Sequence, residues 1–171
     1  MLNNFTLERM ALLFVLAFGT LPVTLAENPP APATSIALAR SAIRRLNHKE
    51  EIACRNMDND ATAKLWADDG VDLIQGMPPM VGKAAIVKWY ESLKPQLRGA
   101  KMEYCTIDWR QQKIEGNWAW EWAVTRQKID PPAPHKPFES EGKMLLILKR
   151  QPSGEWKIEL ESWNSEPPKK K

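Results

Sequence analysis

Two histidines and two cysteines are all that the 171 residues contain of the side chains most often used to hold transition metals. His48 lies in a polar stretch and His135 lies among prolines, and neither has a Cys, His or Glu partner at metal-ligand spacing. The sequence also has no glycine-rich phosphate loop, no serine-centred nucleophile elbow and no Cys–His pair. We therefore expect no metal, no cofactor and no covalent catalysis.

A strong excess of charge of one sign is also missing. The formal net charge is +3, and Lys169–Lys171 alone supply that much. A nucleic-acid-binding domain carries a basic stripe on its folded body, and this sequence shows none. Nucleic acid is therefore not an expected partner, and residues 167–171 are expected to form a solvated lysine-rich tail.

No apolar run reaches the roughly 20 residues needed to span a bilayer. Met10–Leu21 comes nearest, and it precedes Thr24-Leu25-Ala26, a small-x-small cleavage pattern. We interpret residues 1–26 as a signal peptide cleaved after about Ala26, with no stable membrane insertion afterwards. The protein is then exported, to a periplasm or out of the cell, and residues 27–35 form a proline-rich linker.

Export changes the interpretation of Cys54 and Cys105. In an oxidising compartment the two residues can form a persistent disulfide. A bridge requires the helix expected around Cys54 and the strand expected around Cys105 to pack with Cα atoms within about 7 Å. The alternative is two buried free thiols, since cysteine is often simply a small core residue.

Apolar spacing predicts helices and strands in a definite order. Apolar residues three or four apart from Ile36 to Met57, with a gap at Glu50, predict one helix. A short helix after Asp58 and a third over Lys83 to Leu97 show the same spacing. Alternation and turn residues predict the strands, which are 71–75, 80–81, 102–113, 118–128, 139–150 and 156–163. The order α-α-β-β-α-β-β-β-β indicates an α+β domain over residues 36–166.

Four segments in this order resemble the nuclear transport factor 2-like superfamily, and more closely its SnoaL-like proteins and a related domain family of unknown function. The segments are Leu65–Val71 at the step from the second helix into the first strand, Met80–Ile86 at the start of the third helix, Asn117–Ala123 on the fourth strand and Gly142–Ser165 in the closing hairpin. No single segment is specific, but all four lie in the order that the family shows.

The resemblance implies a cone-shaped roll of three N-terminal helices packed on a strongly curved antiparallel sheet. It also implies a homodimer formed through the outer sheet face. It does not imply one activity, because this fold carries isomerases, cyclases, dehydratases and non-catalytic binders.

Asp72 and Leu73 decide whether the steroid-isomerase base is present. In that part of the superfamily the base is an Asp two residues after a Val on the first strand, and counting from Val71 gives Leu73. Asp72 is one step away and therefore points to the opposite face of a regular strand. The resemblance thus implies that the catalytic carboxylate is missing, unless a one-residue bulge turns Asp72 inward.

Glu121 is the other candidate acid, and its direction stays open. Alternation places Trp118, Trp120 and Trp122 on one face of the strand, and Glu121 with its small neighbours on the other. Either Glu121 faces the cavity, or the tryptophans pack inside and Glu121 faces solvent. Exposed tryptophans would form a large apolar patch suited to a dimer surface.

Several polar and aromatic residues are candidates for lining the pocket. Asn, Ser and Tyr side chains can orient a carbonyl or hydroxyl group, and aromatic rings can stack on a flat ligand. Ordinary core packing and cross-strand bonding explain the same residues equally simply. The candidates are Trp66, Leu73, Trp89, Tyr90, Tyr104, Ser162 and Asn164.

From these observations we expect an exported protein that binds a small apolar or amphipathic molecule in a hydrophobic cone pocket, without the usual catalytic base. The first alternative is an isomerase, cyclase or dehydratase that uses Glu121 or Asp72 for proton transfer, like ketosteroid isomerases or polyketide cyclases. The second is a module that docks a partner protein on the tryptophan-rich sheet face.

Overall fold

The computed structural model describes residues 33–166. Its three helices are α1 (Ala33–Asn56), α2 (Asn59–Ala63) and α3 (Lys83–Leu93). The apolar stripe of α1 is buried as its spacing predicts, with Ile43, Leu46 and Ala53 in the core. The third helix ends at Leu93 rather than at Leu97, because Pro95 lacks the backbone N–H that would continue it and the chain turns instead.

Six strands form one sheet in the order β2-β1-β6-β5-β4-β3. The strands are β1 (Trp66–Ile74), β2 (Met80–Val81), β3 (Lys101–Glu115), β4 (Trp118–Asp130), β5 (Phe138–Arg150) and β6 (Trp156–Ser165). The predicted order of elements and the α+β class are confirmed. The sheet is mixed rather than wholly antiparallel, because β1 and β6 pair in parallel.

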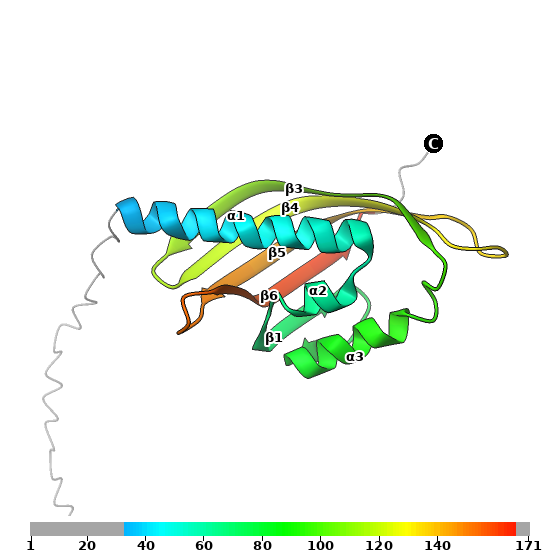
Figure 1. Ribbon diagram of the computed structural model, residues 1–171, viewed down its shortest axis with the longest axis horizontal. Coiled ribbons are helices and arrows are strands. Elements are labelled where there is room, and N and C mark those ends of the chain that lie inside the picture. The colour runs from blue at the N-terminus through cyan, green and yellow to red at the C-terminus, as the bar shows by residue number, and fades with distance from the viewer. Residues whose placement is uncertain (1–32, 167–171) are drawn as a thin grey trace, which may run out of the picture. The chain divides into compact units, whose positions relative to one another are not determined.

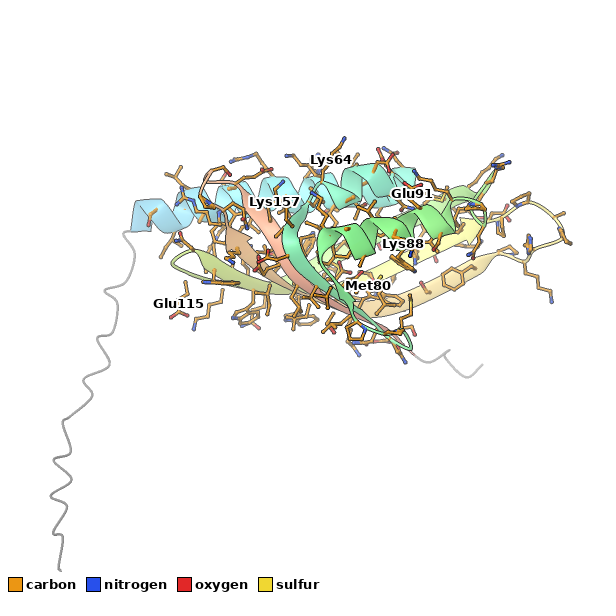
Figure 2. The ribbon with its side chains drawn as sticks, turned by 90° about the horizontal axis from the view of Figure 1, so that it is seen from below. Lys64, Met80, Lys88, Glu91, Glu115 and Lys157 are labelled. Carbon is orange, nitrogen blue, oxygen red and sulfur yellow. A yellow bond between two sulfur atoms is a disulfide. The ribbon has the colours of Figure 1, made fainter. Side chains whose placement is uncertain are left out.

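The helices cover one face of the curved sheet. Figure 1 shows α1 lying across the sheet, with α2 and α3 beside β1. Figure 2, seen from below, shows both long helices on the same side of the strands. The core between the layers is built from residues of helices and strands, among them Ile43, Trp66, Ile86, Leu146 and Ile158.

A bulge in β1 sets which of its side chains point inward. The pairing of β1 with β6 shifts register between Trp66 and Val71. Gly70 lies in this bulge against the Trp66 ring, where a Cβ atom would come within 2.8 Å of a ring carbon. After the shift, Asp72 is buried and Leu73 faces the other side of the sheet. The prediction that Leu73 occupies the inward position is therefore wrong, because Val71, from which that position was counted, itself points outward and pairs with the exposed Val81.

Cys54 of α1 and Cys105 of β3 form a disulfide, with their Cα atoms 6.1 Å apart. The bond joins the helical layer to the strand at one edge of the sheet. It ties together two points that are 51 residues apart in the sequence.

The expected signal peptide and lysine-rich tail lie outside the described residues, as does most of the linker. The last part of that linker, from Ala33, already belongs to α1. None of the helices within residues 33–166 is both long and apolar enough to cross a membrane.

Candidate functional site

Three carboxyl groups lie in one row across the inner face of the sheet. Asp72 pairs with Glu161 on the neighbouring strand. Glu161 pairs with Leu146, and Leu146 pairs in turn with Glu121. Because paired residues share a face, the three acids point to the same side, toward the helices. Asp72 and Glu121 are each only 2% exposed.

A fourth carboxyl group approaches from α1. Glu50 occupies the position on the apolar stripe of α1 where the sequence shows a gap, and it is 6% exposed. Asn47, one turn earlier, is equally buried and forms a side-chain hydrogen bond with Glu121. Gln112 of β3 donates a second hydrogen bond to Glu121, from Nε2 to Oε2, at 2.8 Å. The interior therefore contains a polar cluster, which we call the acid cluster: Glu50, Asp72, Glu121 and Glu161.

Tyr90 brings a hydroxyl group into the same region. Trp66 donates a hydrogen bond from Nε1 to the Tyr90 hydroxyl oxygen at 3.3 Å, and both side chains are buried. Burial first, and then the charges of Glu161, Asp72 and Glu50, raise the pKa of Tyr90. Tyr90 is thus a neutral phenol that keeps its proton available for donation.

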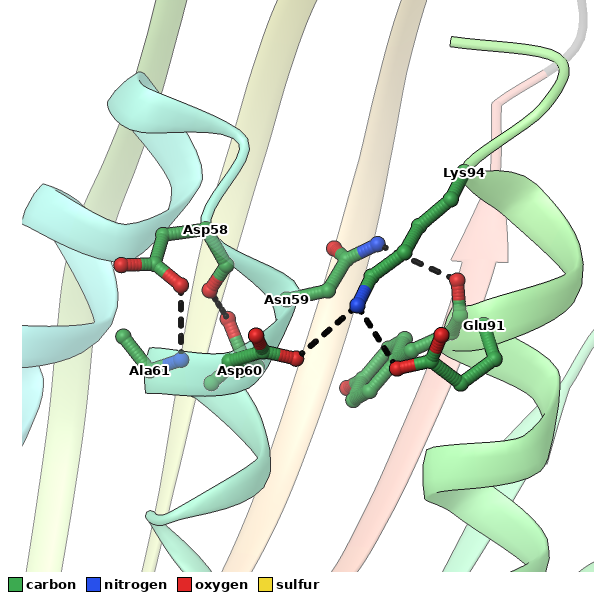
Figure 3. A network of polar contacts seen from close by, with 8 residues as sticks. Asp58, Asn59, Asp60, Ala61, Glu91 and Lys94 are labelled. Atoms are coloured by element: carbon green, nitrogen blue, oxygen red, sulfur yellow. Dashed lines mark hydrogen bonds and ion pairs between the residues drawn. The ribbon is translucent and has the colours of Figure 1, made fainter. Parts of the chain in front are cut away.

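The short helix α2 fixes the part of α3 that carries Tyr90 (Figure 3). Asn59 donates from Nδ2 to the Tyr90 carbonyl oxygen at 3.4 Å. Lys94 pairs with Asp60 at 3.3 Å and with Glu91 at 2.7 Å, so that it bridges the two helices. These ion pairs are exposed and add little stability, but they define the register of α2 against α3.

Burial raises the pKa values of all four acids, since a charge without water is costly. For Glu50, burial and the nearby charges of Glu121 and Glu51 raise the pKa to about 8. For Asp72, burial raises the pKa to about 6, against a smaller lowering by a hydrogen bond with the Leu73 backbone. Near neutral pH, Asp72 is therefore mostly ionised while Glu50 is mostly protonated.

The other two acids follow the same physics. Burial raises the pKa of Glu121, opposed by its hydrogen bonds with Gln112 and Asn47. Burial, together with the charges of Glu50 and Asp72, raises the pKa of Glu161 well above its ordinary value. Glu161 is half-buried on the inner face of the sheet, between Asp72 and Leu146 on the neighbouring strands.

Several buried oxygen atoms of this region have no hydrogen-bond partner within residues 33–166. They are Asn47 Oδ1, Glu50 Oε2, Asp72 Oδ1 and Glu121 Oε1. A buried acceptor without a donor costs about 1–3 kcal/mol, so such atoms rarely persist unless something binds them. In residues 33–166, no group of three or more His, Cys, Asp and Glu side chains is placed to hold a metal ion.

Comparison with known proteins supports the fold. No protein-family model matches the sequence, and no curated protein matches it. Among solved structures, a ketosteroid isomerase-like protein from Erwinia carotovora aligns with a TM-score of 0.65 at 19% identity, over 75% of this chain and 96% of that one. The chain has the nuclear transport factor 2-like fold.

Other proteins with the nuclear transport factor 2-like fold give similar alignments. A hexachlorocyclohexane dehydrochlorinase from Novosphingobium barchaimii has a TM-score of 0.65 at 13% identity, over 80% of this chain and 92% of that one. An NTF2-like protein of unknown function from Pseudomonas putida has a TM-score of 0.60 at 21% identity, over 78% and 91%. Identities this low establish the shared fold and not a shared activity.

The nuclear transport factor 2-like cone brings together only some of the residues expected at its pocket. Asp72, Glu121, Trp66 and Tyr90 meet inside it. Trp89 is half-buried, and its ring centre lies 5.1 Å from that of Tyr90.

Four of the expected pocket residues lie elsewhere. Leu73 and Ser162 pair on the outer sheet face, and Asn164 shares their side of β6 and is exposed. Tyr104 is exposed on β3, donates to Glu139 at 2.6 Å and lines an open surface groove of about 550 Å³ beside the disulfide. Placing these four in the pocket was wrong. In β6 the side chains of Glu161 and Trp163 point inward, so those of Ser162 and Asn164 point outward, and Leu73 pairs with Ser162. Tyr104 lies on the side of β3 that faces away from the helices.

The orientation of β4 settles which face its tryptophans occupy. Ala119, Glu121 and Ala123 are buried on the face toward the helices, while Trp118 is 45% exposed on the opposite face. Ala119 and Ala123 lie in the same core cluster as Ile43 and Leu46 of α1.

Glu50, Glu161 and Asn47 are site residues that were not predicted. The signal for Glu50 was the gap in the apolar stripe of α1. A charged residue at a core-facing position is unusual, because charged side chains are rarely buried without a partner. Glu161 could not be found by alternation, because the pairing of β5 with β6 shifts register between Ile158 and Leu160 and so turns Glu161 inward. Nothing in the sequence around Asn47 distinguishes it from an ordinary helix residue.

Proposed function

We propose that the protein is an enzyme that moves a proton on a small organic molecule held inside the cone, with Asp72 as the general base. The observation that carries this proposal is the inward, buried position of Asp72, with a pKa of about 6. A carboxylate of this kind is ionised near neutral pH and is a stronger base than an exposed one. The expectation of a binder without a base depended on an inward Leu73, and Leu73 points outward.

A buried hydroxyl group near Asp72 supplies the second half of the chemistry. When Asp72 takes a proton from a C–H bond, negative charge develops on the substrate and needs a hydrogen-bond donor. The Tyr90 hydroxyl, which keeps its proton and lies near Asp72, is such a donor. Asp72 then returns the proton to another carbon of the substrate, so both groups end in their starting state. Names of similar structures, an isomerase-like protein and a dehydrochlorinase, agree with this class of reaction.

The test uses two reporters of simple proton abstraction: a nitrobenzisoxazole, which opens on loss of one proton, and a β,γ-unsaturated ketosteroid. We expect Asp72→Asn to lower kcat/KM by at least about 100-fold, the usual contribution of general base catalysis. The wild-type rate should rise with pH through about 6 and level off above it, because the base must be ionised. Turnover of the ketosteroid measures isomerisation, whereas turnover of the benzisoxazole measures only proton abstraction by the base.

Asp69→Asn is the matched control. Asp69 lies on the same strand and is exposed. Its replacement by asparagine changes the net charge by the same amount as Asp72→Asn. It should keep the wild-type rate. Turnover in the wild type no greater than in Asp72→Asn, with both folded by circular dichroism, would contradict the proposal.

We further propose that the protein works as an exported homodimer. The disulfide and the leader-like residues 1–26 support an oxidising location. The outer sheet face supports the dimer, because it exposes Trp118, Leu145 and Val81 with no helix over them. No membrane insertion is proposed for the mature chain.

A further inference from the structure

We propose that the interior of the cone takes a positively charged organic molecule, a protonated amine or a related nitrogen base, in preference to a neutral or acidic one. This inference rests on the proposed function and names the class of substrate for the same site. It replaces the expectation of an apolar ligand with that of a ligand selected by its positive charge.

The first support is the one-sided charge of the interior. The buried polar side chains of residues 33–166 are Asn47, Glu50, Asp72 and Glu121, and none of them is a cation. No Lys, Arg or His within that range is buried. The nearest lysine bonded to the site region, Lys83, is only partly buried and donates to the Trp66 carbonyl oxygen at 3.4 Å. A neutral ligand would leave the acid cluster without any counter-charge.

The second support is independent of the acids' charge. Asn47 is a neutral side chain, 6% exposed, whose Oδ1 has no donor, although its amide is hydrogen-bonded with Glu121 at the cluster. Glu50, Asp72 and Glu121 each present another unpartnered oxygen in the same interior. Asn47 Oδ1 and the ionised carboxylate of Asp72 can only accept hydrogen bonds, so they favour a ligand rich in donors. An ammonium group offers three N–H donors and no acceptor.

Aromatic rings near the acids provide the remaining contacts of an amine site. Trp66 and Tyr90 are buried beside the cluster, and Trp163 follows Glu161 by two residues on the same face of β6. Gly142 leaves room for that ring, since a Cβ atom there would come within 2.9 Å of it. The faces of Trp and Tyr rings attract organic cations by about 0.5–2 kcal/mol each. A hydrated metal ion gains little from such walls.

Binding of an amine must also release protons. In the free protein, several of the acids hold protons because their ionised forms repel each other and lack water. An ammonium group among them stabilises the ionised forms, so protons leave to solvent as the cation arrives and the site's total charge changes little. The titratable and polar groups that interact within the cluster are Asn47 and Glu50 of α1, Tyr90 of α3, Asp72 of β1, Gln112 of β3, Glu121 of β4 and Glu161 of β6.

A cationic substrate also suits the chemistry assigned to Asp72. Positive charge on a nitrogen next to the reacting carbon acidifies the C–H bond, which makes removal of its proton by a carboxylate easier. The base and the charge selection are then two uses of the same cluster.

The experiment compares ligands that differ in charge and little else. Phenethylamine, phenethyl alcohol and phenylacetate are titrated into the full mature protein by calorimetry, near pH 7, in two buffers of different ionisation enthalpy. We expect the amine to bind at least tenfold more tightly than the alcohol, about 1.4 kcal/mol, and phenylacetate to bind least. The heat of amine binding should depend on the buffer, because protons are released. A panel of other amine–alcohol pairs, from cyclohexylamine to larger aromatic amines, is measured in parallel by thermal shift.

Variants locate the binding. Glu50→Gln should weaken amine binding at least tenfold and leave alcohol binding unchanged, while Asp69→Asn, with the same change in net charge at an exposed position, should leave both unchanged. If no amine in the panel binds more tightly than its alcohol, or if Asp69→Asn weakens amine binding as much as Glu50→Gln, the inference is wrong. Turnover is not used here, so loss of the base proposal and loss of the amine preference give separate results.

Discussion

Replacing Glu50 with glutamine should remove much of the pH dependence of the protein's stability. In the folded protein the pKa of Glu50 is raised from 4.5 to about 8, mainly by burial. The folded state therefore holds a proton that the unfolded chain releases between these two values. The stability that depends on this proton is complete below pH 4.5 and is lost as the pH rises through about 8.

The size of the effect follows from the same two values. A difference between 4.5 and about 8 corresponds to about 5 kcal/mol, at 1.36 kcal/mol for each pH unit. This figure is a ceiling, because penetrating water and small movements of neighbours reduce the cost of a buried charge. It is still comparable with the whole free energy of unfolding of a typical domain, about 5–15 kcal/mol.

The assay is urea unfolding of the oxidised protein at about pH 5, 7 and 9, followed by tryptophan fluorescence. Wild-type stability should fall steadily over this range. Glu50→Gln cannot ionise, so its stability should fall by several kcal/mol less and should exceed that of the wild type at the highest pH. Glu161 should also titrate lower in this variant, because the charge of Glu50 contributes to its raised pKa.

Asp69→Asn again serves as the control, since it alters an exposed acid on β1. It should reproduce the wild-type pH dependence. Wild-type stability that is flat or rises between about pH 5 and 9, or a Glu50→Gln variant that falls as steeply as the wild type, would refute the assignment of a buried, protonated Glu50.

Two further predictions concern the disulfide and the outer sheet face. Cys54→Ser combined with Cys105→Ser should lower the free energy of unfolding by about 4 kcal/mol, the loop-closure value for a separation of 51 residues, and unfolding in urea with and without a reductant measures it on the unmodified chain. An unchanged midpoint on reduction would contradict the bond's role. Leu145→Glu places a charge on an exposed position of the outer face and should halve the mass in solution without changing the circular dichroism spectrum. A wild-type protein that is already monomeric at micromolar concentration would count against the dimer.

The order of elements was predictable because it depends on local periodicity. The spacing of apolar residues in α1 and the alternation in β4 and β5 are read directly from the sequence, and tertiary packing reinforces them here. The alternation of Trp118 to Ala123 defined two faces but could not say which was inside. That choice depends on the tertiary packing, in which Ala119 and Ala123 join the core formed with the helices.

The site was less predictable, because it depends on parity and on contacts between distant segments. The pairing of β1 with β6 shifts register between Trp66 and Val71, and beyond the shift Val71 and Leu73 point outward while Asp72 points inward, which exchanges the expected roles of Asp72 and Leu73. A bulge leaves little trace in composition. Glu161 meets Asp72 only because β6 pairs in parallel with β1, a pairing that no local pattern in the two strands indicates.

The bond between Cys54 and Cys105 also limits how far α1 can move from the sheet. Cys54 lies one helical turn beyond Glu50, so the covalent link holds the end of α1 that carries this acid against β3. α3, which carries Tyr90, is held by noncovalent contacts with α2 and β1, including the exposed ion pairs of Lys94. A reductant should therefore loosen the attachment of Glu50 to the sheet while leaving the contacts of α3 intact.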